Sequence, residues 1–208
     1  RRARRILPML FFVMLVSFPY AWKYLLPSDF VEYSQSILSA ILSGSNLFFY
    51  YETTEYGADS SLLKPFLHTW SLGVEEQFYF IFPILLIAVH KFLRTHLLAV
   101  ITVLFILSLQ FSESMSTNNT VLNFFSPLSR FWELLTGSFI AYTELKIGRP
   151  KKGIASATFP IIGLYLVVWS ILSFDASIPH PSFQTIIPIL GVGLILYYSS
   201  QDEPVGKL

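Results

Sequence analysis

The chain has 208 residues, of which 53% are hydrophobic and 13% are charged, and its formal net charge is +1 at pH 7. The charged share is about half of that in an average soluble domain, which indicates that a lipid bilayer is the main solvent. The absence of cysteine excludes disulfide scaffolds, thiolate metal sites and cysteine nucleophiles. A net charge this small gives no indication of a nucleic-acid partner, so none is predicted.

Apolar runs of membrane-spanning length follow one another along the chain. A spanning helix needs about 20 apolar residues, and six runs reach or approach that length: residues 6–26, 67–89, 97–111, 124–145, 154–174 and 184–198. A seventh run, residues 37–51, is shorter and contains serine, glycine and asparagine. We therefore predict an all-α fold, a polytopic transmembrane helix bundle with about six spanning helices and one short re-entrant or interfacial segment.

Lysine and arginine gather at residues 1–5, 91–94 and 146–152. Because positively charged loops stay on the cytoplasmic side of a membrane, all three clusters are predicted to be cytoplasmic. Residues 110–123 and 175–183 then lie outside. Four glycines within the apolar runs are predicted to allow close helix packing: Gly137, Gly163, Gly191 and Gly193.

The run at residues 67–89 begins with polar side chains, and these need a reason. A charged group at mid-bilayer costs about 2.5–3.5 kcal/mol, which makes such groups site candidates. On a helix, His68 and Glu75 would share one face, with Glu76 about a quarter-turn away. A histidine facing a carboxylate suits general acid–base chemistry, with Glu75 the favoured partner. The alternative is a polar cap at the membrane interface, although the depth of the two glutamates favours function.

A second polar intrusion comes from Arg130 and Glu133. Their spacing allows an ion pair along one helix, and Arg130 could instead reach Glu75 or Glu76 on a neighbouring helix. A structural tether and direct substrate contact are both consistent with this pattern.

The arginines at residues 1–5 offer forked donors that match phosphate oxygens, which suits a phosphorylated donor such as a nucleotide or coenzyme A. A topology anchor is the plainer interpretation. The sequence contains no glycine-rich phosphate loop, no nucleophile-elbow motif and no spacing typical of a metal site. Three further histidines are predicted to be surface residues: His90, His96 and His180.

Three segments in this order, residues 2–8, 68–79 and 129–137, resemble the bacterial acyltransferase-3 family of integral membrane acyltransferases. Residues 50–72 resemble in particular the subgroup with an additional C-terminal SGNH-hydrolase-like domain. The resemblance implies transfer of an acyl group, usually acetyl, from cytoplasmic acyl-CoA to a hydroxyl of an outer carbohydrate such as lipopolysaccharide O-antigen or peptidoglycan. It also implies a multi-pass protein of the bacterial inner membrane without a permanently bound cofactor.

The resemblance also implies roles for individual residues. Arg2 and Arg5 match the family's Arg-x-x-Arg motif for acyl-CoA handling, although Arg1 and Arg4 offer an overlapping register. The catalytic candidates are His68, Glu75 and Glu76, and the substrate-binding candidates besides the two arginines are Trp70, Ser71, Gln77, Arg130 and Glu133.

The family's usual catalytic histidine belongs to a first helix upstream of these residues. Residues 1–208 are therefore expected to be a partial transmembrane domain, without its N-terminal helices and C-terminal remainder and inactive alone. A secondary transporter with proton-relaying carboxylates is the competing class, but the inverted repeats that would favour it are not seen. A purely structural membrane protein would leave the paired glutamates unexplained.

Overall fold

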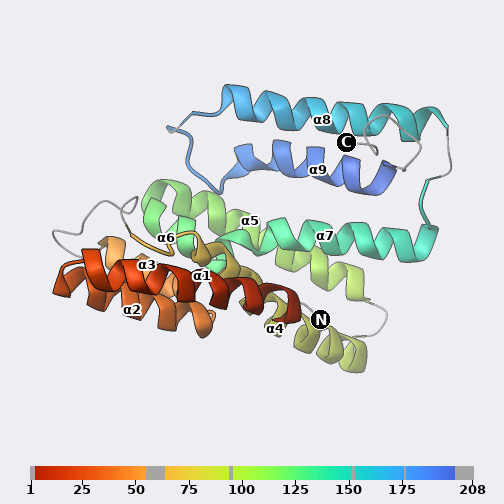
Figure 1. The fold of residues 1–208 in the computed structure, drawn as a ribbon. Helices are drawn as coiled ribbons and strands as arrows, with labels where there is room; N and C mark the ends of the chain where they lie inside the picture. Colours follow the sequence, from red (N-terminus) through yellow and green to blue (C-terminus); the bar gives the residue numbers. More distant parts are fainter. Residues whose placement is uncertain (1–2, 55–63, 94–95, 151–152, 176, 200–208) are drawn as a thin grey trace. The chain divides into compact units, whose positions relative to one another are not determined.

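The computed structural model describes residues 3–54, 64–93, 96–150, 153–175 and 177–199. These residues form helices and connecting turns without a strand, so the predicted all-α class is confirmed (Figure 1). The elements in chain order are α1 (Ala3–Tyr24), α2 (Pro27–Ile41), α3 (Ser45–Thr54), α4 (Thr69–Phe92), α5 (Leu97–Asn118), α6 (Thr120–Phe125), α7 (Pro127–Ile147), α8 (Ile154–Ser173), the 3-10 turn η3 (Phe183–Thr185) and α9 (Ile186–Tyr198).

Four of these helices, α1, α4, α5 and α8, are long and apolar enough to cross a membrane. Residues 183–198 form a shorter apolar helical segment. Helix α7 has the length of a span but carries Arg130 and Glu133 within it. All six predicted runs are thus helical, and four of them meet the length and composition of a span among the described residues.

The seventh run differs from its prediction as one short segment. Residues 37–51 are divided between the end of α2 and most of α3, and the chain turns between them at Leu42–Gly44. The turn passes through Ser43, whose φ of 56° lies in the left-handed region and ends α2. Helix α2 begins with Pro27 in its first turn, as the fixed φ of proline allows.

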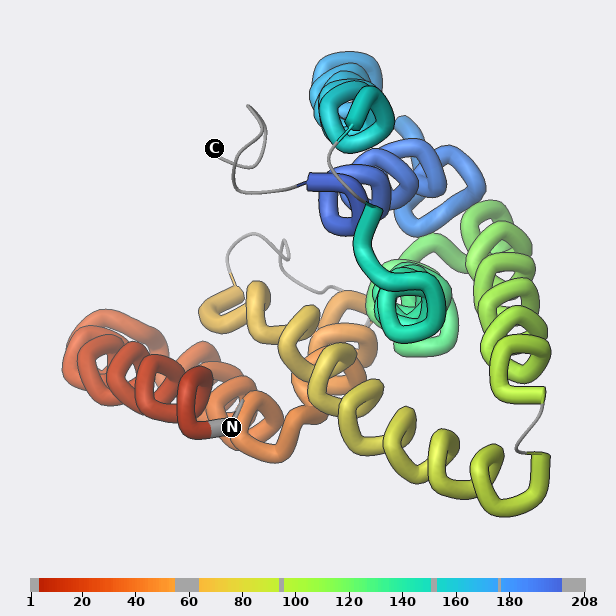
Figure 2. Tube along the Cα trace, turned by 90° about the vertical axis from the view of Figure 1, so that its right-hand side faces the viewer, coloured from red at the N-terminus to blue at the C-terminus, as the bar shows by residue number. Residues whose placement is uncertain are grey.

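The chain forms two compact units, residues 1–77 and residues 78–208. In the first unit α1 and α2 lie side by side, as the red and orange segments in Figure 2 show. The Ser17 hydroxyl lies 2.8 Å from the hydroxyl of the buried Tyr33, and Phe30 packs edge-on against Trp22. Helices α1 and α2 therefore contact each other through both a hydrogen bond and aromatic packing.

In the second unit α5 packs against α7. The Ser108 hydroxyl donates to the Leu128 carbonyl at 2.5 Å and accepts from the Trp132 amide at 3.0 Å. It therefore bridges two backbone groups four residues apart in the first turns of α7. The fully buried Trp132 ring also meets Phe105 edge-on, which fixes the register of the two helices.

Helices α8 and α9 cross at two glycines, as predicted. A Cβ atom built on Gly163 would lie 2.4 Å from the Gly191 carbonyl oxygen, and one on Gly191 would lie 2.6 Å from the Gly163 oxygen. No side chain fits between the two backbones. The prediction is wrong for Gly137, where a Cβ would meet nothing within 4 Å.

The loops of the second unit meet in pairs at its two ends. Asn123 donates to the Pro181 carbonyl, and the Phe183 amide donates to the Glu113 carboxylate. At the other end the Tyr197 hydroxyl lies 3.2 Å from the Gly148 carbonyl. The two segments predicted to be outside are thus hydrogen-bonded to each other.

Candidate functional site

Helix α4 begins one residue later than the predicted His68–Glu75 face requires. Phe66 is buried and has a left-handed φ of 61°, so the chain turns sharply there. The backbone amide of Thr69 then donates to the Phe66 carbonyl, and α4 begins at Thr69. His68 consequently lies in a turn before the helix, exposed, with its ring 6.1 Å from that of Phe66. The helical periodicity that grouped it with Glu75 does not apply.

Gln77 joins α4 to the turn between α2 and α3. Its side-chain amide donates to the Ser43 carbonyl at 2.9 Å and to the Asn46 side-chain oxygen at 2.8 Å. One turn earlier, Gly73 allows this approach, because a Cβ there would lie 3.1 Å from the Asn46 oxygen. Asn46 is fully buried. The predicted candidate Gln77 therefore binds one backbone carbonyl, of Ser43, and the buried side-chain oxygen of Asn46.

Glu76 lines a cavity of about 180 Å³ within the first unit. We name this cavity the Glu76 pocket; its other lining residues come from α1, from the end of α2 and the turn that follows, and from α4: Ile6, Leu7, Leu10, Ala40, Ile41, Ser43 and Leu72. The walls are therefore mostly aliphatic, and the glutamate is the charged group among them. Glu75, the glutamate that the sequence favoured, is partly buried and does not line this pocket.

Lys64 ties the segment before α4 to α2 and α3. Its ammonium lies 2.5 Å from the Glu52 carboxylate and 3.4 Å from that of Glu32, and only 8% of its side chain is exposed. Burial on its own would lower the pKa of Lys64, but the hydrogen bond and charge of Glu52, with those of Glu32, outweigh it and hold this pKa above its ordinary value. Nothing in the sequence pattern indicated this contact.

The remaining candidates of the first unit take different positions. Trp70 is partly buried, and the exposed Ser71 donates its hydroxyl to the His68 carbonyl at 3.2 Å, as in an ordinary helix first turn. Arg5 is exposed on the first turn of α1, next to Ile6 of the Glu76 pocket. Arg2 lies outside the described residues.

Arg130 and Glu133 form the predicted ion pair along α7, with 3.4 Å between a guanidinium nitrogen and a carboxylate oxygen. Arg130 also donates from Nε to the Phe124 carbonyl, and its guanidinium lies 5.2 Å from the centre of the Phe124 ring. These contacts hold the arginine at the start of α7, beside the end of α6.

Some buried polar atoms among the described residues of the second unit have no hydrogen-bond partner. Among the described residues, five buried polar atoms have no partner: the hydroxyl oxygens of Ser112, Ser129 and Ser182, the side-chain oxygen of Asn123 and the indole nitrogen of Trp132. A buried polar atom without a partner costs about 1–3 kcal/mol. Because Asn123, Ser129 and Trp132 are fully buried, their atoms are enclosed within the packed helices of the unit.

His180, which the sequence placed among the surface residues, is partly buried near this pair. Burial of the imidazole lowers the pKa of His180, and the positive charge of Arg130 lowers it further. The preceding loop gave no signal of this proximity, because His180 follows α7 by more than thirty residues along the chain.

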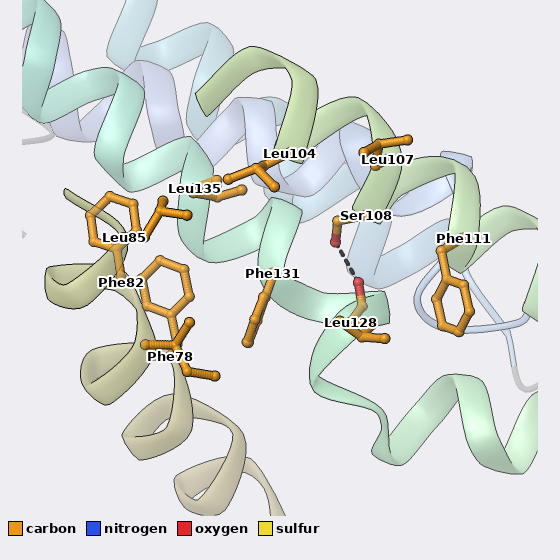
Figure 3. Close-up of a pocket in the computed structure, with 11 residues that line it drawn as sticks. Phe78, Phe82, Leu85, Leu104, Leu107, Ser108, Phe111, Leu128, Phe131 and Leu135 are labelled. Carbon is orange, nitrogen blue, oxygen red and sulfur yellow. Dashed lines mark hydrogen bonds between the residues drawn. The ribbon is translucent and has the colours of Figure 1, made fainter. Parts of the chain in front are cut away.

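The largest cavity described, of about 480 Å³, lies elsewhere in the second unit, between α4, α5 and α7 (Figure 3). Phenylalanine, leucine and isoleucine line it, and its single polar side chain, Ser108, points to the Leu128 carbonyl to which it donates (Figure 3). The lining contains no acid or base, and the Ser108 hydroxyl is occupied by its two backbone hydrogen bonds. The chemistry of this chain is therefore better sought at the smaller Glu76 pocket and near Arg130.

The sequence pattern of the acyltransferase-3 family, described as an acyltransferase domain, matches residues 1–205. The chain belongs to this family. Together with its apolar helices, this identifies a multi-pass membrane protein with an acyltransferase domain. The predicted family and enzyme class are confirmed.

The chain is also similar to individual bacterial proteins. It is 33% identical to an uncharacterized protein of Haemophilus influenzae, over 98% of this chain and 86% of that protein. Identity is 29% to the putative membrane-bound transacylase BcsY of Komagataeibacter xylinus and 24% to the O-acetyltransferase OatA of Staphylococcus aureus. The chain covers 52% of the first of these two proteins and 38% of the second. No solved structure shows a significant match to it.

Proposed function

We propose that the protein transfers an acyl group, in the first instance acetyl, from cytoplasmic acyl-CoA to a hydroxyl of a cell-envelope glycan in the bacterial inner membrane. The observation that carries this proposal is a carboxylate, Glu76, in a pocket lined mainly by aliphatic residues and Ser43, within two turns of the arginines at the start of α1. Those arginines supply forked donors for the phosphates of coenzyme A. The resemblance of OatA, named as an O-acetyltransferase, supports acetyl as the group.

The reaction requires a base, a held thioester and a bound hydroxyl. The hydroxyl oxygen bonds to the thioester carbonyl carbon, the carbon–sulfur bond breaks, and coenzyme A leaves as the thiol with the proton of the hydroxyl. The base is proposed to be the histidine on the upstream helix that the family resemblance implies. A carboxylate in an apolar site can orient such a base or tune its pKa. We assign this role to Glu76, with Gln77 holding α4 in register through Ser43 and Asn46.

The acceptor is proposed to bind near Arg130 and Glu133. The two loops that meet there are those predicted to be outside, and the partly buried side chains of Arg130 and Glu133 offer a donor and an acceptor for sugar hydroxyls. Lipopolysaccharide O-antigen and peptidoglycan are the acceptors to try first.

Glu76→Gln tests the central role. It keeps size and hydrogen bonding but removes the charge, so a polar cap would tolerate it and an orienting carboxylate would not. In cells making the intact protein, we expect Glu76→Gln to lower incorporation of radiolabelled acetyl groups into the glycan fraction by about 10²-fold, at unchanged protein in the membrane.

Glu144→Gln is the matched control, because Glu144 pairs with the exposed Arg149 beyond the candidate site. It should leave incorporation unchanged. Full incorporation in both Glu76→Gln and the Glu75→Gln, Glu76→Gln double variant would remove these carboxylates from the mechanism.

A further inference from the structure

The Glu76 pocket has a two-part chemistry. Most of its wall is aliphatic, from α1, α2 and α4, and its polar groups are the Glu76 side chain and Ser43. A ligand that fills it therefore needs both an apolar part and a polar part. A sugar would turn several hydroxyls towards apolar walls, which is costly, and a phosphate would meet the Glu76 carboxylate.

An acyl group joined to sulfur meets both requirements, because its carbonyl is polar and its alkyl tail is apolar. The volume of about 180 Å³ limits that tail to a short one. Two walls are rigid as well: Leu10 is 8% exposed and Ala40 is 5% exposed, so both are held by neighbouring side chains.

The start of α1 brings a candidate phosphate contact near this pocket. Arg5 adjoins Ile6, which lines the pocket, and precedes Leu10 by five residues. A donor whose phosphates contact Arg5 would fold its pantetheine arm back along α1 to place the thioester in the pocket.

We infer that the Glu76 pocket receives the acyl end of the donor, and that Leu10 and Ala40 set the length of the acyl chain the enzyme accepts. This inference rests on the proposed acyl-CoA donor and adds the two residues that select among donors.

The test compares acetyl-, propionyl-, butyryl- and hexanoyl-CoA as donors for membranes that contain the intact protein, with release of free coenzyme A thiol as the readout. Leu10→Ala widens the pocket, and we expect it to raise the ratio of butyryl-CoA to acetyl-CoA consumption by about tenfold, since one or two methylenes in a fitted pocket discriminate by at least that factor. Ala40→Leu fills the pocket and should reduce propionyl- and butyryl-CoA consumption more than acetyl-CoA consumption.

Each variant has a buried control in the same unit that does not line the pocket. Met14→Ala removes a side chain one helical turn beyond Leu10. Ala21→Leu adds the same atoms as Ala40→Leu, but at a buried alanine that lies in α1 and not in α2. Both should keep the wild-type order of donors. If Leu10→Ala does not reach the membrane, the milder Leu10→Val and the Ala40→Leu variant answer the same question.

The outcomes separate the two claims. Wild-type membranes that release no thiol from any of the four donors overturn the proposed function, and the inference with it. Membranes that consume acyl-CoA with the same ratio of donors in Leu10→Ala, Ala40→Leu and their controls overturn the inference alone.

Discussion

The start of α4 and the crossing of α8 with α9 hold helices together in opposite ways. At α4, the Gln77 side chain donates two hydrogen bonds across the helix contact, to Ser43 and Asn46. At α8 and α9, Gly163 and Gly191 bring two backbones together without any side chain between them. In a bilayer, the hydrophobic effect does not drive helices together, so hydrogen bonds between helices and close packing of small residues hold them in contact.

The two helix contacts differ in the side chains that surround them. The glycine crossing is surrounded by apolar side chains such as Val167 and Ile195 and presents no reactive group. The α4 contact places Glu76 beside a pocket, and Ser43 and Phe66 nearby in the chain fold are in left-handed conformations. A non-glycine residue in that region costs about 1–2 kcal/mol. The α4 contact thus combines close approach at Gly73 with hydrogen bonds and strained turns beside the candidate chemistry, whereas the α8–α9 crossing relies on glycines among apolar side chains.

The largest effect is expected from breaking the glycine crossing. Gly163→Leu must move the Gly191 backbone, which a Cβ alone would approach to 2.4 Å. Separating α8 from α9 should prevent a stable fold, with a loss above about 3 kcal/mol. The measurement is the amount of detergent-resistant, protease-resistant protein recovered from membranes.

Gly137→Ala is its control, because a Cβ there meets nothing within 4 Å and α7 continues on both sides. Alanine is favoured over glycine inside a helix by about 0.5–1 kcal/mol. Recovery should therefore equal or exceed wild type. Wild-type recovery of Gly163→Leu would show that α8 and α9 do not need this contact.

A smaller effect is expected from breaking the polar contact. Gln77→Leu leaves the buried Asn46 side-chain oxygen and the Ser43 carbonyl without this donor, which should destabilise the first unit by about 1–3 kcal/mol. Because Gln77 adjoins Glu76, acyl transfer should fall further than stability. Thermal unfolding of the purified protein and thiol release at one temperature measure the two losses.

Gln35→Leu changes the same side chain at an exposed position of α2 and should alter neither quantity. Equal thermal stability of Gln77→Leu and Gln35→Leu would contradict the tie between α4 and the turn after α2.

The sequence predicted the features that depend on long patterns. Apolar runs located six helices, and the glycines predicted to allow close approach include Gly163 and Gly191, where α8 and α9 do approach closely. Helix α2 was missed because it is short and carries Asp29 and Glu32, so a search for apolar runs of spanning length does not find it. Gly137 shows that a glycine in a span is not evidence of close packing without knowledge of what faces it.

The candidate site depends on a turn and on contacts between distant residues, and neither is encoded in the periodic pattern of apolar residues. The left-handed φ of Phe66 decides that α4 starts after His68, and a periodic pattern cannot locate a start to one residue. The pairing of Arg130 with Glu133 was predictable because it is local. The contact of Lys64 with Glu52 and the position of His180 join distant parts of the chain, and nothing in one sequence signals them.

The smallest expected effect is a difference in pH response between the loop at residues 177–185, which contains His180, and the segment at residues 64–70, which contains Lys64. The pKa of His180 is lowered, first by burial and then by Arg130, so the unfolded loop binds a proton more tightly than the folded one. The stabilisation this gives is fully present above about pH 6.5, the ordinary histidine value, and is lost as the pH falls. The pKa of Lys64 is raised, so its contribution is full below about pH 10.4 and is lost only above that.

Between pH 8 and pH 5, amides of residues 177–185 should therefore lose protection against hydrogen exchange, after correction for intrinsic rates, while those of residues 64–70 keep theirs. Asp175 lies in the same loop, but hydrogen bonds from Ser177 lower its pKa, so it titrates below this window. His180→Gln should abolish the difference between the two regions, whereas replacing the exposed His96 by Gln should preserve it. Retention of the pH-dependent loss in His180→Gln would assign it to another group at this end of the second unit, and would separate His180 from the Arg130 site.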